Sequence, residues 1–110
     1  MKKRILITIL IIFFIIVLFI FIKLIKTQEI PVDFVKCLGE KSVLYVQLGC
    51  HACETQEKAF GKNYKYLTKV DCFFESEKCQ GITYTPTWVI NGERYVGVQS
   101  EERLKELTGC

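Results

Sequence analysis

The longest uninterrupted apolar stretch of the chain runs from Ile5 to Ile22 and contains no charged residue and only one hydroxyl side chain, Thr8. At about 1.5 Å of rise per residue, a helix over this stretch is roughly 27 Å long, close to the hydrocarbon thickness of a bilayer. A helix buried in a soluble core would carry a polar stripe, and this stretch has none. We therefore expect residues 1–26 to form a cytoplasmic flank and a transmembrane anchor, which leaves room for one folded domain at most.

A cleaved secretory signal is the alternative for this segment, because Met1-Lys2-Lys3-Arg4 is a good basic n-region. Signals usually have a shorter apolar run, followed by small residues at the cleavage site. Here the residues at positions 21–26 are bulky or charged. We therefore favour an uncleaved anchor.

The distribution of positive charge predicts the orientation of this anchor. Three basic residues and the terminal amine precede the apolar run, whereas the two lysines that follow it are soon joined by Glu29 and Asp33. This bias favours a cytoplasmic N-terminus and an extracytoplasmic segment 27–110 in a single-pass protein of the cell membrane. Six cysteines in 110 residues fit that compartment, because disulfides persist outside the cytoplasm. The net charge of +3 includes the basic flanks, so we infer no nucleic-acid partner.

We expect residues 27–32 to be a linker and residues 33–110 to be one folded domain. Its predicted elements are, in order, a helix capped by Asp33 and ended by Gly39, a strand over 43–48, a helix over 50–60, a strand over 66–70, a short helix over 76–80, strands over 87–90 and 94–98, and a helix from Ser100 to Leu107. Asn91-Gly92 between the last two strands is a strong hairpin signal. A βαβ unit followed by ββα is the core of the thioredoxin fold. We therefore expect an α/β domain with a mixed four-stranded sheet and helices on both faces.

The segment Cys50-His51-Ala52-Cys53 lies where a predicted strand ends and a helix begins. The first backbone N–H groups of a helix have no partner within it and stabilise a negative sulfur, and such positions lower a cysteine pKa from about 8.5 to roughly 3.5–7.5. Cys50 is therefore the predicted attacking sulfur. Cys53, one turn deeper, is expected to resolve the mixed disulfide. His51, if protonated, would favour the Cys50 thiolate, and its alternative is a solvated turn residue.

A metal clip and a purely structural disulfide are the alternatives for this cysteine pair. Zinc would need two more soft ligands, and the spacing of Cys72 and Cys79 does not match the usual short knuckle. A structural bridge between Cys50 and Cys53 would close too tight a ring to constrain the unfolded chain much. We therefore favour a redox-active pair and assign neither a metal nor a cofactor.

Thr85-Pro86-Thr87 comes immediately before a predicted strand. A proline there can simply be a turn residue. Opposite a Cys-x-x-Cys turn in this fold, however, a cis Thr85–Pro86 bond would hold the backbone of Thr85 near Cys50, where it can pair with an extended substrate segment. Thr85 and Pro86 are therefore included in the candidate site.

Four further cysteines lie outside the Cys50–Cys53 motif. Cys72 and Cys79 flank a short loop, and we expect a structural disulfide worth about 2–3 kcal/mol in the chain-entropy model. The alternative is a second redox pair that relays electrons to Cys50–Cys53. Cys37 is expected to be a small buried group on the first helix of the domain, and Cys110 to be unpaired or joined to another chain.

These residues resemble the thioredoxin-like domain fused to bacterial and archaeal homologues of vitamin K epoxide reductase. The resemblance covers nearly all of residues 34–109 and is carried by the Cys50–Cys53 motif, by Cys72 and Cys79, and by Tyr84-Thr85-Pro86-Thr87-Trp88-Val89-Ile90-Asn91-Gly92. It implies a redox-active Cys50–Cys53 pair that oxidises or rearranges protein thiols and passes electrons to a quinone-reducing membrane partner.

Two departures from that family bear on the expected function. Gly49 replaces the usual aromatic residue before the first cysteine, and His51-Ala52 replaces Pro-His, so the choice between oxidase, isomerase and reductase stays open. The multi-helix quinone-reductase portion is not in this sequence, so we expect a separate membrane protein to supply it. The sequence thus predicts a membrane-anchored thiol–disulfide oxidoreductase acting on secreted or membrane protein thiols. The alternatives are a non-catalytic thioredoxin-like adaptor and a copper- or zinc-handling module.

Overall fold

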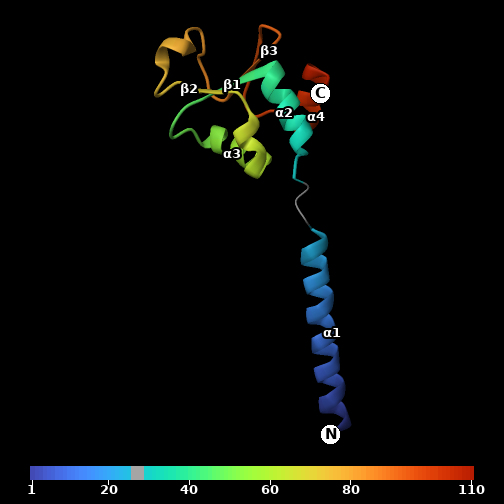
Figure 1. Cartoon of the computed structure of the whole chain (residues 1–110). Helices are drawn as coiled ribbons and strands as arrows, with labels where there is room; N and C mark the ends of the chain where they lie inside the picture. Colours follow the sequence, from blue (N-terminus) through green and yellow to red (C-terminus); the bar gives the residue numbers. More distant parts are fainter. Residues whose placement is uncertain (26–28) are drawn as a thin grey trace.

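Helix α1, Lys2–Leu24, covers the whole apolar run, and none of its residues is buried (Figure 1). The computed structural model describes residues 1–25 and 29–110. Within them, α1 is the one helix long and apolar enough to cross a membrane. Residues 26–28, where the predicted anchor ends and the predicted linker begins, lie outside the described residues.

The rest of the described chain is a mixed α/β domain. Its elements are α2 (Val32–Lys41), β1 (Ser42–Val46), α3 (His51–Phe60), the 3-10 helix η1 (Gly61–Tyr66), β2 (Lys69–Asp71), the 3-10 helix η2 (Ser76–Cys79), β3 (Thr87–Ile90), β4 (Glu93–Val96) and α4 (Glu101–Thr108). The strands form one sheet in the order β2-β1-β3-β4. β1 and β2 are parallel, and the other two pairs are antiparallel. The predicted mixed four-stranded sheet is confirmed.

The turn between β3 and β4 is the tight hairpin that Asn91-Gly92 predicts. Asn91 has φ +53° and Gly92 has φ +79°. Two successive positive φ angles match the right-handed twist of the strands, and Asn and Gly adopt them at little cost.

The buried core lies on one face of this sheet. Leu44 of β1 pairs with Trp88 of β3, and both are fully buried. The same core cluster contains residues from all three α-helices of the domain: Phe34, Val35 and Leu38 from α2, Phe60 from α3 and Leu104 from α4. These helices therefore pack against the Leu44–Trp88 face.

The opposite face of the sheet is less well covered. Alternate residues of a strand point to opposite faces, so Val43, Tyr45 and Val89 lie there, and all three are only half-buried. Val96 is 57% exposed. Thr87 also lies on this face and is buried. The three α-helices of the domain share the Leu44–Trp88 face, so helices on both faces are not confirmed. The segment between β2 and β3 forms only the short η2, which is too small to cover the sheet.

The boundaries of α2 differ from the predicted ones. Its N-cap is Pro31, and Asp33 makes no capping hydrogen bond. Gly39 lies inside the helix instead of ending it. A Cβ at this position would lie 2.3 Å from the carbonyl oxygen of Tyr66, so Gly39 allows α2 to approach the end of η1 closely.

The strand boundaries also shift by a few residues. β1 ends at Val46 instead of residue 48, and Tyr66 belongs to η1 instead of β2. The core also begins before the predicted domain start, because Ile30 is 7% exposed and its carbonyl accepts a hydrogen bond from Asn63.

Candidate redox site

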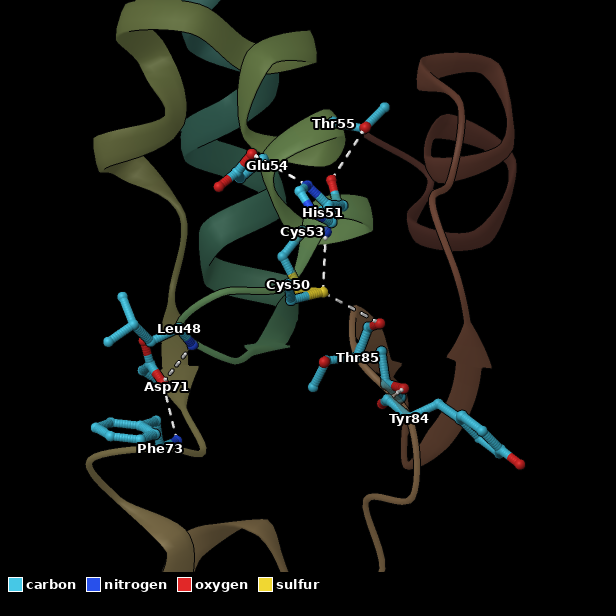
Figure 2. The surroundings of a disulfide bond; sticks show 11 residues. Leu48, Cys50, His51, Cys53, Glu54, Thr55, Asp71, Phe73, Tyr84 and Thr85 are labelled. Atoms are coloured by element: carbon cyan, nitrogen blue, oxygen red, sulfur yellow. Dashed lines mark hydrogen bonds and ion pairs between the residues drawn. A yellow bond between two sulfur atoms is a disulfide. The ribbon is translucent and has the colours of Figure 1, made fainter.

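Cys50 and Cys53 form a disulfide at the start of α3, with their Cα atoms 5.2 Å apart. Cys50 is the N-cap residue, and the backbone N–H of Cys53 donates a hydrogen bond to its Sγ at 3.1 Å (Figure 2). Cys50 is half-buried, whereas Cys53 is only 6% exposed. The predicted placement is confirmed: Cys50 caps the helix and is the more accessible sulfur.

A short loop between β1 and α3 presents Cys50. Gly49 has φ +82°, a conformation that residues with a Cβ rarely adopt. The N–H of Cys50 donates to the carbonyl of Gln47 at 3.1 Å, and the N–H of Leu48 donates to Oδ1 of Asp71 at 3.3 Å. The loop is therefore held both by its own turn and by a side chain of β2.

Thr85 lies beside the first sulfur, as the sequence predicts. The Thr85–Pro86 peptide bond is cis, and the carbonyl oxygen of Thr85 is 3.5 Å from Sγ of Cys50 (Figure 2). The carbonyl of Pro86 accepts a hydrogen bond from the N–H of Gly97 at 2.8 Å, which ties this loop to the end of β4. The structure thus brings together four of the predicted site residues: Cys50, Cys53, Thr85 and Pro86.

His51 is the first residue of α3 and faces solvent. Its side chain is 99% exposed, and its Nδ1 lies 3.9 Å from Oε2 of Glu54. Water and salt screen a charge in such a position strongly. An influence of His51 on the Cys50 thiolate stays a prediction.

An open cavity of about 440 Å³ borders both cysteines of the pair. Its walls include the loop 47–50, the side of α3 that carries Glu54 and Glu57, and the edge formed by η1, β2 and the residues after it. The residues of that edge are Tyr64, Lys69, Asp71 and Glu75. The sequence analysis missed this cavity. Two features of the sequence could have indicated the cavity. Cys53 and Glu57 are four residues apart, which places both on one side of a helix, and β2 contains polar residues.

The ionisable groups of this cavity perturb one another. Nζ of Lys69 donates hydrogen bonds to the carbonyls of Tyr64 at 2.8 Å and Leu67 at 3.1 Å. Burial lowers the pKa of Lys69, and the charge of Glu57 opposes that shift. Burial, followed by the negative charges of Glu57 and Asp71, raises the pKa of Tyr64 to about 12. The lining of the cavity contains four carboxylates and one ammonium, so it is mainly acidic beside the disulfide.

Cys72 and Cys79 form the expected second disulfide, with Cα atoms 5.7 Å apart. The N–H of Cys72 donates to the carbonyl of Val46 at 2.8 Å, so this bridge begins next to the strand that leads to Cys50. Whether the bridge is structural or redox-active stays open.

Cys37 and Cys110 form a third disulfide, so the expectation of an unpaired or intermolecular Cys110 is wrong. Cys37 lies on the first helix of the domain, as expected, but it is half-buried and bridged. Gly109 adopts the left-handed conformation after α4, with φ +71°, and redirects the chain. Lys41 Nζ also donates to the carbonyl of Thr108 at 3.2 Å. The packing of α2 beside α4 brings the two sulfurs together.

Within residues 1–25 and 29–110, no group of three or more His, Cys, Asp or Glu side chains is arranged to hold a metal ion. No protein-family model matches the chain.

Proposed function

We propose that this chain is a membrane-anchored thiol–disulfide oxidoreductase whose thioredoxin-like domain lies outside the cytoplasm. The observation that carries the proposal is the position of the Cys50 sulfur, which caps α3 and lies 3.5 Å from the Thr85 carbonyl. The order of the elements from β1 to α4 supports the thioredoxin-like assignment. The length and composition of α1 support the anchor.

The environment of Cys50 suits thiolate chemistry. When the disulfide is reduced, the Cys53 N–H and the free N–H groups of the first turn of α3 favour a negative charge on Sγ of Cys50. A thiolate stabilised in this way is a good leaving group, which makes the disulfide more oxidising. The greater exposure of Cys50 directs attack to that sulfur.

The proposed reaction is a balanced two-electron exchange. A substrate thiolate attacks Sγ of Cys50, the Cys50–Cys53 bond breaks, and Cys53 leaves as a thiolate that takes up a proton. A second substrate thiolate then attacks the substrate sulfur of the mixed disulfide and releases Cys50 as the thiolate that the start of α3 stabilises. The substrate gains a disulfide, the enzyme keeps two electrons, and the protons of the two substrate thiols go to Cys53 and to the solvent.

A separate membrane protein that reduces quinone would return the enzyme to its oxidised form. The reduced pair would pass its electrons to a disulfide of that partner by the reverse exchange. The resemblance to domains fused to vitamin K epoxide reductase homologues supports this partner. The substrates would be thiols of secreted or membrane proteins.

Oxidative refolding of a reduced test protein by the full chain in detergent micelles, with oxidised glutathione as the terminal oxidant, tests the proposal. Cys50→Ser should abolish catalysis. Cys53→Ser, mixed with a scrambled test protein that already contains disulfides, should accumulate a mixed disulfide, because the Cys50 thiolate attacks a substrate disulfide and no second cysteine releases it. The double variant Cys37→Ser/Cys110→Ser is the matched control for loss of a disulfide elsewhere. Full activity in Cys50→Ser would reject an enzyme, and a Cys53→Ser variant that traps no substrate would favour a non-catalytic adaptor.

A further inference from the structure

Leu48, Phe73 and Phe74 form an exposed apolar rim on two loops, one of which leads from β1 to Cys50. Their exposed fractions are 61%, 60% and 68%. The N–H groups of Leu48 and Phe73 both donate to Oδ1 of Asp71, at 3.3 and 2.9 Å, so one carboxylate holds the two loops side by side (Figure 2). The rings of Phe73 and Phe74 meet edge to face with centroids 5.0 Å apart. Exposed apolar groups gathered at one place on a surface often mark an interaction site.

The cavity beside this rim is acidic. Four carboxylates line it, from Glu54, Glu57, Asp71 and Glu75, and its lining includes a single ammonium, that of Lys69. The ammonium already donates to two backbone carbonyls, which leaves one N–H donor. Outside the lining, Lys78 forms an ion pair with Glu75, so Glu54, Glu57 and Asp71 carry most of the acidic character. Burial raises the pKa of Tyr64, and the charges of Glu57 and Asp71 raise it further. A cationic side chain is the complementary occupant of this space.

Leu48 connects the rim to the cavity, because Leu48, Cys50 and Cys53 all belong to the lining of the cavity. A substrate segment that places its sulfur on Cys50 would therefore hold its neighbouring residues against both features. Thr85, on the other side of Cys50, offers a backbone carbonyl along which an extended segment can lie.

We propose that the apolar rim and the acidic cavity together bind an extended substrate segment whose reactive cysteine is flanked by a large apolar residue and by Lys or Arg. The inference rests on the proposed function and specifies its substrate class. Large apolar residues are mostly buried once a protein has folded. The preferred substrates are therefore cationic segments of polypeptides that have not yet folded.

Competition between matched peptides tests this inference on the full chain in detergent micelles. Each peptide carries two cysteines on a flexible spacer, flanked either by Phe and Lys, by Phe and Glu, or by Ser and Glu. The rate of oxidation of each peptide by the Cys50–Cys53 disulfide is divided by its rate with oxidised glutathione, which corrects for differences in thiol reactivity. The Phe and Lys peptide should react at least about tenfold faster than the Ser and Glu peptide, and added salt should reduce the Lys preference.

Variants separate the two halves of the proposed surface. Phe73→Ser/Phe74→Ser should reduce the preference for Phe, and Glu57→Gln/Glu75→Gln should reduce the preference for Lys. Val96→Ser and Glu102→Gln are the matched controls, since both residues are exposed and neither belongs to the rim or the cavity. Each result is a ratio between two peptides, so any general loss of activity cancels.

Oxidation of dithiothreitol distinguishes failure of this inference from failure of the proposed function. A wild-type chain that oxidises neither dithiothreitol nor any peptide contradicts the function itself. Oxidation of dithiothreitol with equal normalised rates for all peptides overturns only the substrate preference. Hydroxyl-radical labelling of Phe73 and Phe74 in lipid nanodiscs and in detergent then tests where the rim lies. Equal normalised peptide rates together with weaker labelling in nanodiscs would show that the rim faces the bilayer instead of a substrate.

Discussion

Nε1 of Trp88 donates a hydrogen bond to Oε1 of Gln56 at 3.1 Å, and both side chains are fully buried. The same oxygen accepts from the N–H of Gln99 at 2.8 Å, and Nε2 of Gln56 donates to the carbonyl of Gln99 at 3.2 Å. One amide therefore connects α3, the helix that carries the cysteine pair, to the centre of the sheet and to the loop before α4.

Gln56→Leu should destabilise the domain by about 2–4 kcal/mol, because it leaves the buried Nε1–H of Trp88 and the partly buried N–H of Gln99 without a partner. Trp88 is the single tryptophan of the chain, so its fluorescence follows unfolding in urea directly. Gln80→Leu, at an exposed position, is the matched control and should change stability by less than about 0.5 kcal/mol. Equal midpoints for both variants would show that the Gln56 network adds nothing.

Loss of the Cys37–Cys110 bridge should cost more stability than loss of Cys72–Cys79. The two bridges join residues 73 and 7 positions apart. In the chain-entropy model they contribute about 4 and about 2.5 kcal/mol. Urea unfolding of Cys37→Ser/Cys110→Ser and of Cys72→Ser/Cys79→Ser measures the difference. An equal or reversed order would mean that structure in the unfolded chain, and not loop length, sets the effect.

Substitutions of Asp71 should separate its charge from its hydrogen bonds. Asp71→Asn keeps an acceptor oxygen for Leu48 and Phe73 but removes a negative charge near the site, so reduced Cys50 should be alkylated faster at neutral pH. Asp71→Ala removes the acceptor as well and should loosen both loops, which increased proteolysis near them would reveal. Glu77→Gln, an exposed charge outside the cavity, is the control. The same alkylation rate in Asp71→Asn and wild type would contradict an electrostatic role.

Stability should fall as pH rises between about 10 and 12 because of Tyr64, whose pKa is raised from 10.0 to about 12 in the folded protein. In this window the unfolded chain loses the phenolic proton while the folded chain retains it, so alkali favours unfolding. Tyr64→Phe should show a shallower fall in its urea midpoint, measured within minutes to limit disulfide rearrangement. Tyr84→Phe, at a side chain that is 70% exposed, should follow the wild type. Parallel curves for all three proteins would contradict this assignment.

Local signals in the sequence predict several parts of this structure well. Cys50 caps α3, Asn91-Gly92 forms the hairpin turn, and Oγ of Ser100 accepts a hydrogen bond from the N–H of Arg103 at the start of α4. Each of these depends on residues within a few positions of one another, where side-chain type and backbone conformation are directly linked.

Features that depend on distant contacts could not be predicted in the same way. Gly39 reads as a helix end, but it lies inside α2 because Tyr66 approaches it. The partner of Cys37 is fixed only by the packing of α2 beside α4. The acidic cavity likewise requires the parallel pairing of β1 with β2, which places Asp71 opposite Val46. Tertiary packing, and not local preference, decides each of these.

The bridge from Cys37 to Cys110 closes nearly the whole domain into a covalent ring. One proteolytic cut between these residues would leave both pieces attached to each other, and to the membrane if α1 spans it. A pulling force applied between α1 and Cys110 would likewise pass through the sulfur–sulfur bond and bypass the sheet. The force would therefore not act on the redox site until that bond was reduced.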